Sequence, residues 1–320
     1  MKSPHKFLFL FLMMASTCMV LSSSNWLMTW MGLEINMLGF IPLMYMKDTA
    51  NESETVVKYL IPQSLGSTVF IASATISLHL DNIQSLMALA MCLKLGAAPF
   101  HFWFPPVMAG LPLLPAFILL TWQKIAPIFT ISAISPTLMS KIMLVASISA
   151  LWGGIGGMNQ TDIRSLLTYS SIAHTGWMLA SINSAAPVLS VYIMAYVLIN
   201  LSIFTALTST STKFHKQLLT PKEPYNSLLL AASILSLGGL PPLTGFIMKL
   251  LVISYTQTSL FVIFTLILGA LISLFYYLSL TFSPLLELTK TRLNKSHISK
   301  PSMVFFLAQI LPLSTLMFLF

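Results

Sequence analysis

Charged residues are scarce in this sequence. They make up 8% of the 320 residues, and the chain has only eight acidic residues against sixteen lysines and arginines. Hydrophobic residues make up 56%, and the mean hydropathy is +0.86. Soluble globular domains and disordered chains both carry far more charge, so these two classes are excluded.

Cysteine is scarce as well. The two cysteines, Cys18 and Cys92, both lie inside apolar segments. This pattern rules out a disulfide framework, a four-cysteine iron–sulfur site and a CxxC redox motif, and we expect no cofactor or metal in this chain. The net charge of +8 does not indicate a nucleic-acid partner, because the basic residues are spread over short loops between apolar runs.

Long apolar runs dominate the sequence instead. Their continuity excludes a transmembrane β-barrel, whose strands alternate in polarity. The sequence therefore predicts an all-α polytopic membrane protein, with residues 1–320 forming a single membrane domain. The first run resembles a signal peptide but lacks a clean cleavage site, so we expect it to be a spanning helix. Eleven segments approach the ~20 residues that a transmembrane helix needs: about 7–22, 26–46, 58–80, 83–104, 112–131, 140–159, 166–182, 187–207, 226–254, 259–281 and 302–319.

The loops predict the topology. If the segments alternate in direction, twelve lysines and arginines fall on the side of the N-terminus and only Lys141 falls on the other side. Positive charge accumulates on the cytoplasmic side of membrane proteins, or on the equivalent matrix side in mitochondria. We therefore expect the N-terminus to face the cytoplasm or the matrix.

Besides histidines, four ionisable residues lie in the interior of predicted helices: Glu34, Lys94, Lys124 and Lys249. A charge at mid-membrane costs roughly 2.5–3.5 kcal/mol, so four unpaired charges cost roughly 10–14 kcal/mol. Such residues are typical of pathways for ions or protons. The alternative is a structural role, in which Glu34 pairs with a lysine and offsets much of the cost.

Two of the lysines accompany predicted helix breaks. The motif LGxxP occurs at 95–99 and again at 237–241, close to Lys94 and Lys249. Proline removes a backbone donor, and broken helices at membrane depth line protein or watery cavities. The predicted break residues are Gly96, Pro99, Gly238, Gly239, Pro241 and Pro242. The spacing predicts two five-helix units, 7–131 and 140–281, followed by a C-terminal helix at 302–319. Because five is odd, the units would form an inverted repeat, as in many transporters.

Other residues leave alternatives open. His174 suits a proton relay, because a neutral imidazole donates and accepts at once, but a structural histidine satisfied by a serine or a carbonyl fits equally well. His101 lies at the end of the first break and has either a functional or an interface role, whereas we expect His79 to be structural. The glycine cluster at 153–157 lacks the lysine and hydroxyl residue of a phosphate-binding loop, so it predicts close helix packing.

Several stretches together resemble the subunit 2 family of mitochondrial NADH:ubiquinone oxidoreductase, respiratory complex I. These stretches are residues 26–36, 94–103, 121–127, 159–161 with 169–171, and 236–246. The resemblance covers nearly the whole chain and implies an antiporter-like, proton-translocating subunit of the inner membrane. The N-terminus would lie in the matrix, with lipid and other membrane-arm subunits as partners and redox chemistry confined to other subunits. The resemblance also implies that Glu34, Lys94, Lys124 and Lys249 take part in proton transfer. Pro106 replaces a polar or acidic residue of many relatives, so no proton-entry role is expected there.

The resemblance suggests a mechanism in which Glu34 and Lys94 form a pair whose distance changes during turnover. At ~4 Å and an effective dielectric constant of ~20, such a pair is worth about 4 kcal/mol. Loosening it would move a proton from Lys94 to Lys124 and then to Lys249. Two alternatives remain at this point: a stand-alone cation/proton antiporter, and an assembly subunit without a proton path.

Overall fold

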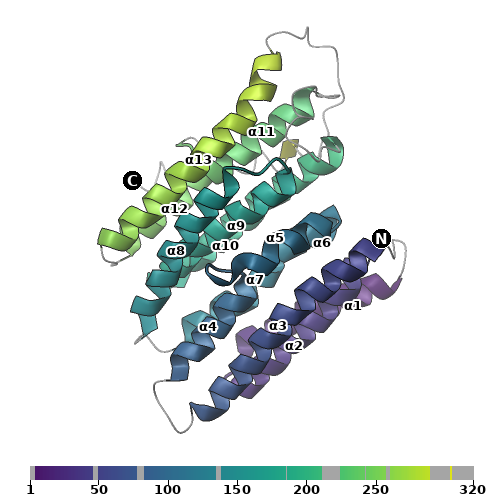
Figure 1. The fold of residues 1–320 in the computed structure, drawn as a ribbon, viewed down its shortest axis with the longest axis vertical. Coiled ribbons are helices and arrows are strands. Elements are labelled where there is room, and N and C mark those ends of the chain that lie inside the picture. The colour runs from purple at the N-terminus through teal and green to yellow at the C-terminus, as the bar shows by residue number, and fades with distance from the viewer. Residues whose placement is uncertain are drawn as a thin grey trace. The chain divides into compact units, whose positions relative to one another are not determined.

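The computed structural model describes residues 4–45, 50–77, 83–134, 138–184, 186–210, 224–241, 243–256, 260–288 and 303–304. Helices form the regular structure of this part of the chain (Figure 1). They are α1 (Pro4–Ser22), α2 (Trp26–Met44), α3 (Ala50–Ile76), α4 (Gln84–Leu95), the 3-10 helix η2 (Phe100–Trp103), α5 (Phe104–Gly110), α6 (Leu113–Leu120), α7 (Trp122–Ala133), α8 (Met139–Gly157), α9 (Ile163–Ser181), α10 (Ala186–Thr210), α11 (Pro224–Gly238), α12 (Thr244–Tyr255) and α13 (Leu260–Leu288).

The predicted all-α membrane fold is confirmed. Among the residues that the structure describes, seven helical stretches are long and apolar enough to cross a membrane: His5–Ser22, Trp26–Met44, Gln84–Gly110, Leu113–Ala133, Met139–Gly157, Pro187–Thr210 and Leu260–Phe282. Two shorter apolar helices follow one another at Asn226–Gly238 and Thr244–Tyr255. The predicted C-terminal helix at 302–319 lies almost wholly outside the described residues, so the count of eleven stays a prediction.

Two helices differ from their predicted segments, one in where it begins and the other in how deeply it is buried. α3 begins at Ala50, eight residues before the predicted start, so that Lys58 lies within the helix and pairs with Glu54 at 2.6 Å on the exposed side. α9 is buried along nearly its whole length, from Ile163 to Ser181. A helix covered by protein on all sides does not need a lipid-facing apolar surface, which explains why α9 tolerates its serines and threonines.

The chain divides into two compact units, Met1–Val145 and Ala146–Phe320. In the first unit, α1, α2 and α3 lie side by side, α3 packs against α4, and α4 packs against α7 (Figure 1). In the second unit, α11 packs against α13 and α10, and α10 also contacts α12. The boundary lies inside α8, and the inverted relation of the two units remains a prediction.

The glycine cluster confirms the predicted role in helix packing. Gly153 and Gly156 face α9, where an added Cβ would collide with the backbone at Ala173 and with the ring of Tyr169. The other two glycines of the cluster face α13 in the same way. Because glycine has no side chain, α8 approaches both neighbours closely.

Candidate functional site

The first helix break lies directly after Lys94. α4 ends at Leu95, and Gly96 adopts a φ of +68°, the left-handed conformation that glycine accepts without a steric penalty. The Ala98–Pro99 peptide bond is cis, and the chain continues as η2 and α5. The sequence analysis predicted a helix break at Gly96 and Pro99. In the structure, the backbone leaves the helical conformation between these residues.

The carbonyl groups near the end of α4 accept hydrogen bonds from three donors in other parts of the chain. The Leu93 oxygen accepts the backbone N–H of Gly96 at 3.1 Å and the indole N–H of Trp103 at 3.1 Å. The side-chain amide of Gln63 on α3 donates to the Lys94 oxygen at 3.0 Å. A helix end inside a membrane needs such partners because no bulk water replaces them. The end of α4 is therefore fixed by side chains from other helices.

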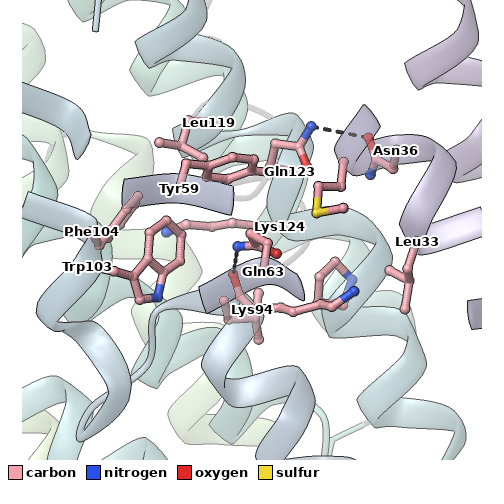
Figure 2. Close-up of a pocket in the computed structure, with 13 residues that line it drawn as sticks. Leu33, Asn36, Tyr59, Gln63, Lys94, Trp103, Phe104, Leu119, Gln123 and Lys124 are labelled. Atoms are coloured by element: carbon pink, nitrogen blue, oxygen red, sulfur yellow. Dashed lines mark hydrogen bonds between the residues drawn. The ribbon is translucent and has the colours of Figure 1, made fainter. Parts of the chain in front are cut away.

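Lys94 is held in a buried position, with 6% of its surface exposed. Gly66 on α3 makes room for it, since a Cβ there would come within 2.8 Å of the lysine Cγ. The side chain runs toward Leu33 on α2 (Figure 2). The neighbouring carboxylate of Glu34, which is half-buried, acts electrostatically on Lys94, but no ion pair joins the two among the described residues. Glu34 therefore lies near Lys94 without a direct contact, and their pairing during turnover stays a prediction.

Lys124 follows a further interruption that the sequence analysis did not anticipate. α6 ends at Leu120, Thr121 departs from helical geometry with φ −109° and ψ −70°, and α7 begins at Trp122. The Thr121 hydroxyl donates to the carbonyl of Phe117 at 2.7 Å. Lys124 is 4% exposed, and its ammonium nitrogen lies 5.8 Å from the ring centroid of Phe104, within the range of a cation–π contact.

A small cavity, called the lysine cavity below, contains both lysines. Its wall comes from α2, α3, α4, η2, α5, α6 and α7, through Leu33, Asn36, Met37, Tyr59, Gln63, Lys94, Leu95, Trp103, Phe104, Leu119, Gln123, Lys124 and Pro127. About 20 Å³ is open to the centres of water molecules, which is enough room for one or two waters. In Figure 2, Lys94 and Lys124 extend in opposite directions from this cavity.

Three amide side chains of the cavity had no predicted role. Asn36, Gln63 and Gln123 each lie in a predicted spanning segment, and the amide nitrogen of Gln123 donates to the side-chain oxygen of Asn36 at 3.1 Å. A polar side chain in the middle of an apolar run was the available indication. It does not reveal which amides meet, because that depends on how the helices pack.

At the second break, the ammonium group of Lys249 lies against the C-terminal end of α11. α11 ends at Gly238, Gly239 has a φ of +86°, and α12 begins at Thr244, while Pro242 lies outside the described residues. The Lys249 ammonium donates to the carbonyl of Gly238 at 2.8 Å and to that of Leu237 at 3.2 Å. A positive charge is favourable at a helix C-terminus, where unpaired carbonyls give the dipole its negative end.

His174 lies in a buried aromatic cluster of the second unit. Its Nδ1 and the hydroxyl of Tyr192 are 2.8 Å apart, and its ring centroid lies 5.2 Å from that of Tyr196. At Nδ1, His174 thus meets a tyrosine hydroxyl, a partner that the sequence analysis did not name. His101, buried in η2, stacks on Phe102 at 4.6 Å, and His79 lies outside the described residues.

Comparisons with known proteins identify the family to which the chain is similar. The transmembrane family described as NADH:quinone oxidoreductase/Mrp antiporter matches residues 23–275. The chain is 36% identical to NADH-ubiquinone oxidoreductase chain 2 of Nandinia binotata, over 99% of both chains. It is 40% identical to the protein of that name from Metachirus nudicaudatus, over 86% of this chain and 84% of the relative.

Solved structures share the fold. A chain of respiratory complex I from Thermus thermophilus matches with a TM-score of 0.81 and 22% identity, over 96% of this chain and 78% of that chain. A chain of the Mrp complex from Dietzia matches with a TM-score of 0.72 and 16% identity, over 92% of this chain and 61% of that chain.

Proposed function

Because the chain belongs to the NADH:quinone oxidoreductase/Mrp antiporter transmembrane family, we propose that it is a proton-translocating, antiporter-like core membrane subunit of respiratory complex I. It is part of an enzyme, the H⁺-translocating NADH:ubiquinone reductase, and works within a multisubunit membrane complex. The relatives of 36–40% identity that bear this name favour complex I over a stand-alone antiporter.

The burial of three lysines in apolar helices carries the proposal. Lys94, Lys124 and Lys249 are 6%, 4% and 9% exposed, and each follows or precedes an interruption of its helix by a few residues. On insertion scales, three such charges cost about 8–10 kcal/mol at mid-membrane. An assembly subunit would be more stable with apolar side chains in these places. The cost is explained if the lysines bind and release protons.

Each of the three lysines has a neighbouring group that stabilises its positive charge. Lys94 interacts with the carboxylate of Glu34, Lys124 with the ring of Phe104, and Lys249 with carbonyls at the end of α11. When Glu34 moves away, the charged form of Lys94 becomes more costly, because the attraction falls with distance. The lysine cavity has room for a water that can carry the released proton toward Lys124. Transfer to Lys249 completes the path through the chain, with His174 as a candidate relay.

Location and partners follow from the same proposal. The chain lies in the mitochondrial inner membrane with its N-terminus in the matrix, as the charge asymmetry of the loops predicts. It contacts lipid and the other membrane-arm subunits, and many large apolar side chains are exposed for such contacts, including Phe7 at 74% and Leu260 at 84%. It holds no redox cofactor, so electrons travel through other subunits.

Purification from the native membrane tests the proposal. A tagged chain solubilised in mild detergent should elute in a large assembly that reduces quinone with NADH and pumps protons once returned to vesicles. Recovery of the chain by itself, exchanging a cation for protons without NADH, would favour the stand-alone antiporter instead.

A further inference from the structure

A hydrogen bond between two amides links the helices that carry Glu34 and Lys124. The Nε2 of Gln123 donates to the Oδ1 of Asn36 at 3.1 Å, and both side chains line the lysine cavity (Figure 2). Gln123 directly precedes Lys124 on α7. Asn36 lies two residues after Glu34 on α2 and is 3% exposed. The bond therefore joins a residue adjacent to Lys124 with a residue two positions after Glu34.

The bond lies where its two helices otherwise meet little. α2 packs extensively against α1 and α3 and has only a few contacts with α7. α7 packs mainly against α4, α1 and α6. Within the lipid bilayer, asparagine and glutamine bind across helices because lipid offers no competing partner. The amide pair therefore adds a specific polar link between α2 and α7 where the direct packing of the two helices is sparse.

The bond also leaves one polar group of each amide for the cavity. It uses the nitrogen of Gln123 and the oxygen of Asn36, so an acceptor oxygen remains on Gln123 and a donor nitrogen on Asn36. Both belong to the wall of a cavity with room for one or two waters. The pair is therefore suited to orient a water near the two lysines as well as to hold the helices.

We propose that Gln123 and Asn36 are positioning residues that form a clasp between α2 and α7. The clasp makes the helix of Glu34 and the helix of Lys124 move together. A change in the distance between Glu34 and Lys94 then also changes the position of Lys124 across the cavity. The proposal rests on the proposed function, because it describes how the movement of Glu34 is coordinated with proton transfer between Lys94 and Lys124.

The test replaces the amides in the assembled complex. Asn36→Leu and Gln123→Leu remove the bond with side chains of similar volume, and the double exchange Asn36→Gln with Gln123→Asn restores an amide pair of the same total length. Ser132→Ala is the matched control on α7, because Ser132 is exposed and donates to a carbonyl of its own helix. The measurements are the amount of assembled complex, NADH-driven quinone reduction per complex, protons pumped per NADH, and the solvent isotope effect in D₂O.

We expect the leucine variants to assemble to within about a factor of two and to lose about tenfold in coupled turnover, since misplacement by ~1 Å can cost up to about 100-fold. Their isotope effect should rise, because proton transfer becomes rate-limiting. The double exchange should recover most of the turnover, and Ser132→Ala should resemble the wild type.

Three results would overturn the clasp. One is unchanged turnover and isotope effect in the leucine variants, another is a loss of assembled complex with normal turnover per complex, and the third is a double exchange as impaired as the leucine variants. If the leucine variants fail to assemble, the single variant Gln123→Asn is measured in their place. We expect it to lose turnover and to show a higher isotope effect, and unchanged values of both would overturn the clasp. Lys124→Arg, measured in parallel, separates the two ideas: normal pumping by this variant contradicts the proposed function itself.

Discussion

The ammonium nitrogen of Lys249 lies 2.8 Å from the carbonyl oxygen of Gly238, the last residue of α11. The lysine belongs to α12, so its side chain reaches back across the break and satisfies a carbonyl that has no partner within its own helix. The charge of Lys249 thereby stabilises the interrupted backbone, and the carbonyls stabilise the charge. A proton that leaves Lys249 weakens this contact, so the protonation of the lysine and the geometry of the break are linked.

The position of Gly239 makes this link testable. Gly239 has a φ of +86°, and an added Cβ would lie 3.2 Å from the Lys249 nitrogen. We expect Gly239→Ala to lower both the thermal stability of the complex and its pumping, because the left-handed conformation costs about 1–2 kcal/mol without glycine. Gly239→Asn tolerates that conformation better but keeps the Cβ. If asparagine restores stability and not pumping, the contact with the lysine matters; recovery of both would mean that only the backbone conformation does.

Substitution of Lys124 separates a proton carrier from a structural charge. Arginine keeps its positive charge at any relevant pH and does not release a proton, whereas lysine can be neutralised by burial. We expect Lys124→Arg to assemble and to lose most proton-coupled quinone reduction, and Lys124→Ala to lose it as well without abolishing assembly. Complex abundance is measured alongside turnover. A fully assembled Lys124→Arg variant that pumps nearly normally would show that the lysine is structural.

The glycine contacts of α8 predict a purely structural defect. A Cβ at Gly153 would collide with the backbone of α9. We therefore expect Gly153→Val to destabilise the second unit by about 1–3 kcal/mol, the usual cost of overpacking, and to reduce the amount of complex. Ile155→Ala on the same helix, where the side chain is 55% exposed, is the control and should have a much smaller effect. Equal abundance of the two variants would contradict the packing role.

The charge asymmetry predicts which loops face the matrix. We expect the predicted loops 47–57, 160–165, 208–225 and 282–301 to be on that side, because the basic residues gather there. Residues 50–57 of the first segment form the beginning of α3. Single cysteines placed in these loops should resist an impermeant thiol reagent added to intact inner membrane from the intermembrane side. Labelling of loop 208–225 under these conditions would reverse the predicted topology.

The cysteine content predicts the spectrum of the purified chain. With Cys18 and Cys92 as its only thiols and no nucleotide-binding motif, the chain should contain no stoichiometric flavin, haem or iron–sulfur cluster. Absorbance and metal analysis of the isolated subunit check this expectation. A flavin or cluster present at one per chain would refute it.

The sequence by itself determined the features that depend on local chain properties. Apolar runs of sufficient length specify membrane helices wherever they occur, because the bilayer leaves the backbone no other partner than itself. The break after Lys94 was readable for a similar reason: Gly96 accepts a positive φ, and Pro99 lacks an N–H. The interruption at Thr121 was not readable, since no glycine or proline marks it and a side-chain bond to Phe117 accompanies it.

The tertiary structure alone decided which polar groups meet. Gln123 and Asn36 are 87 residues apart, and nothing in either segment specifies the other as a partner. Lys249 and Gly238 are only 11 residues apart, yet the lysine reaches the carbonyl because two half-helices are folded against each other across the break. A single helix is shaped by its own residues, whereas a cavity between helices depends on the packing of every side chain that separates them.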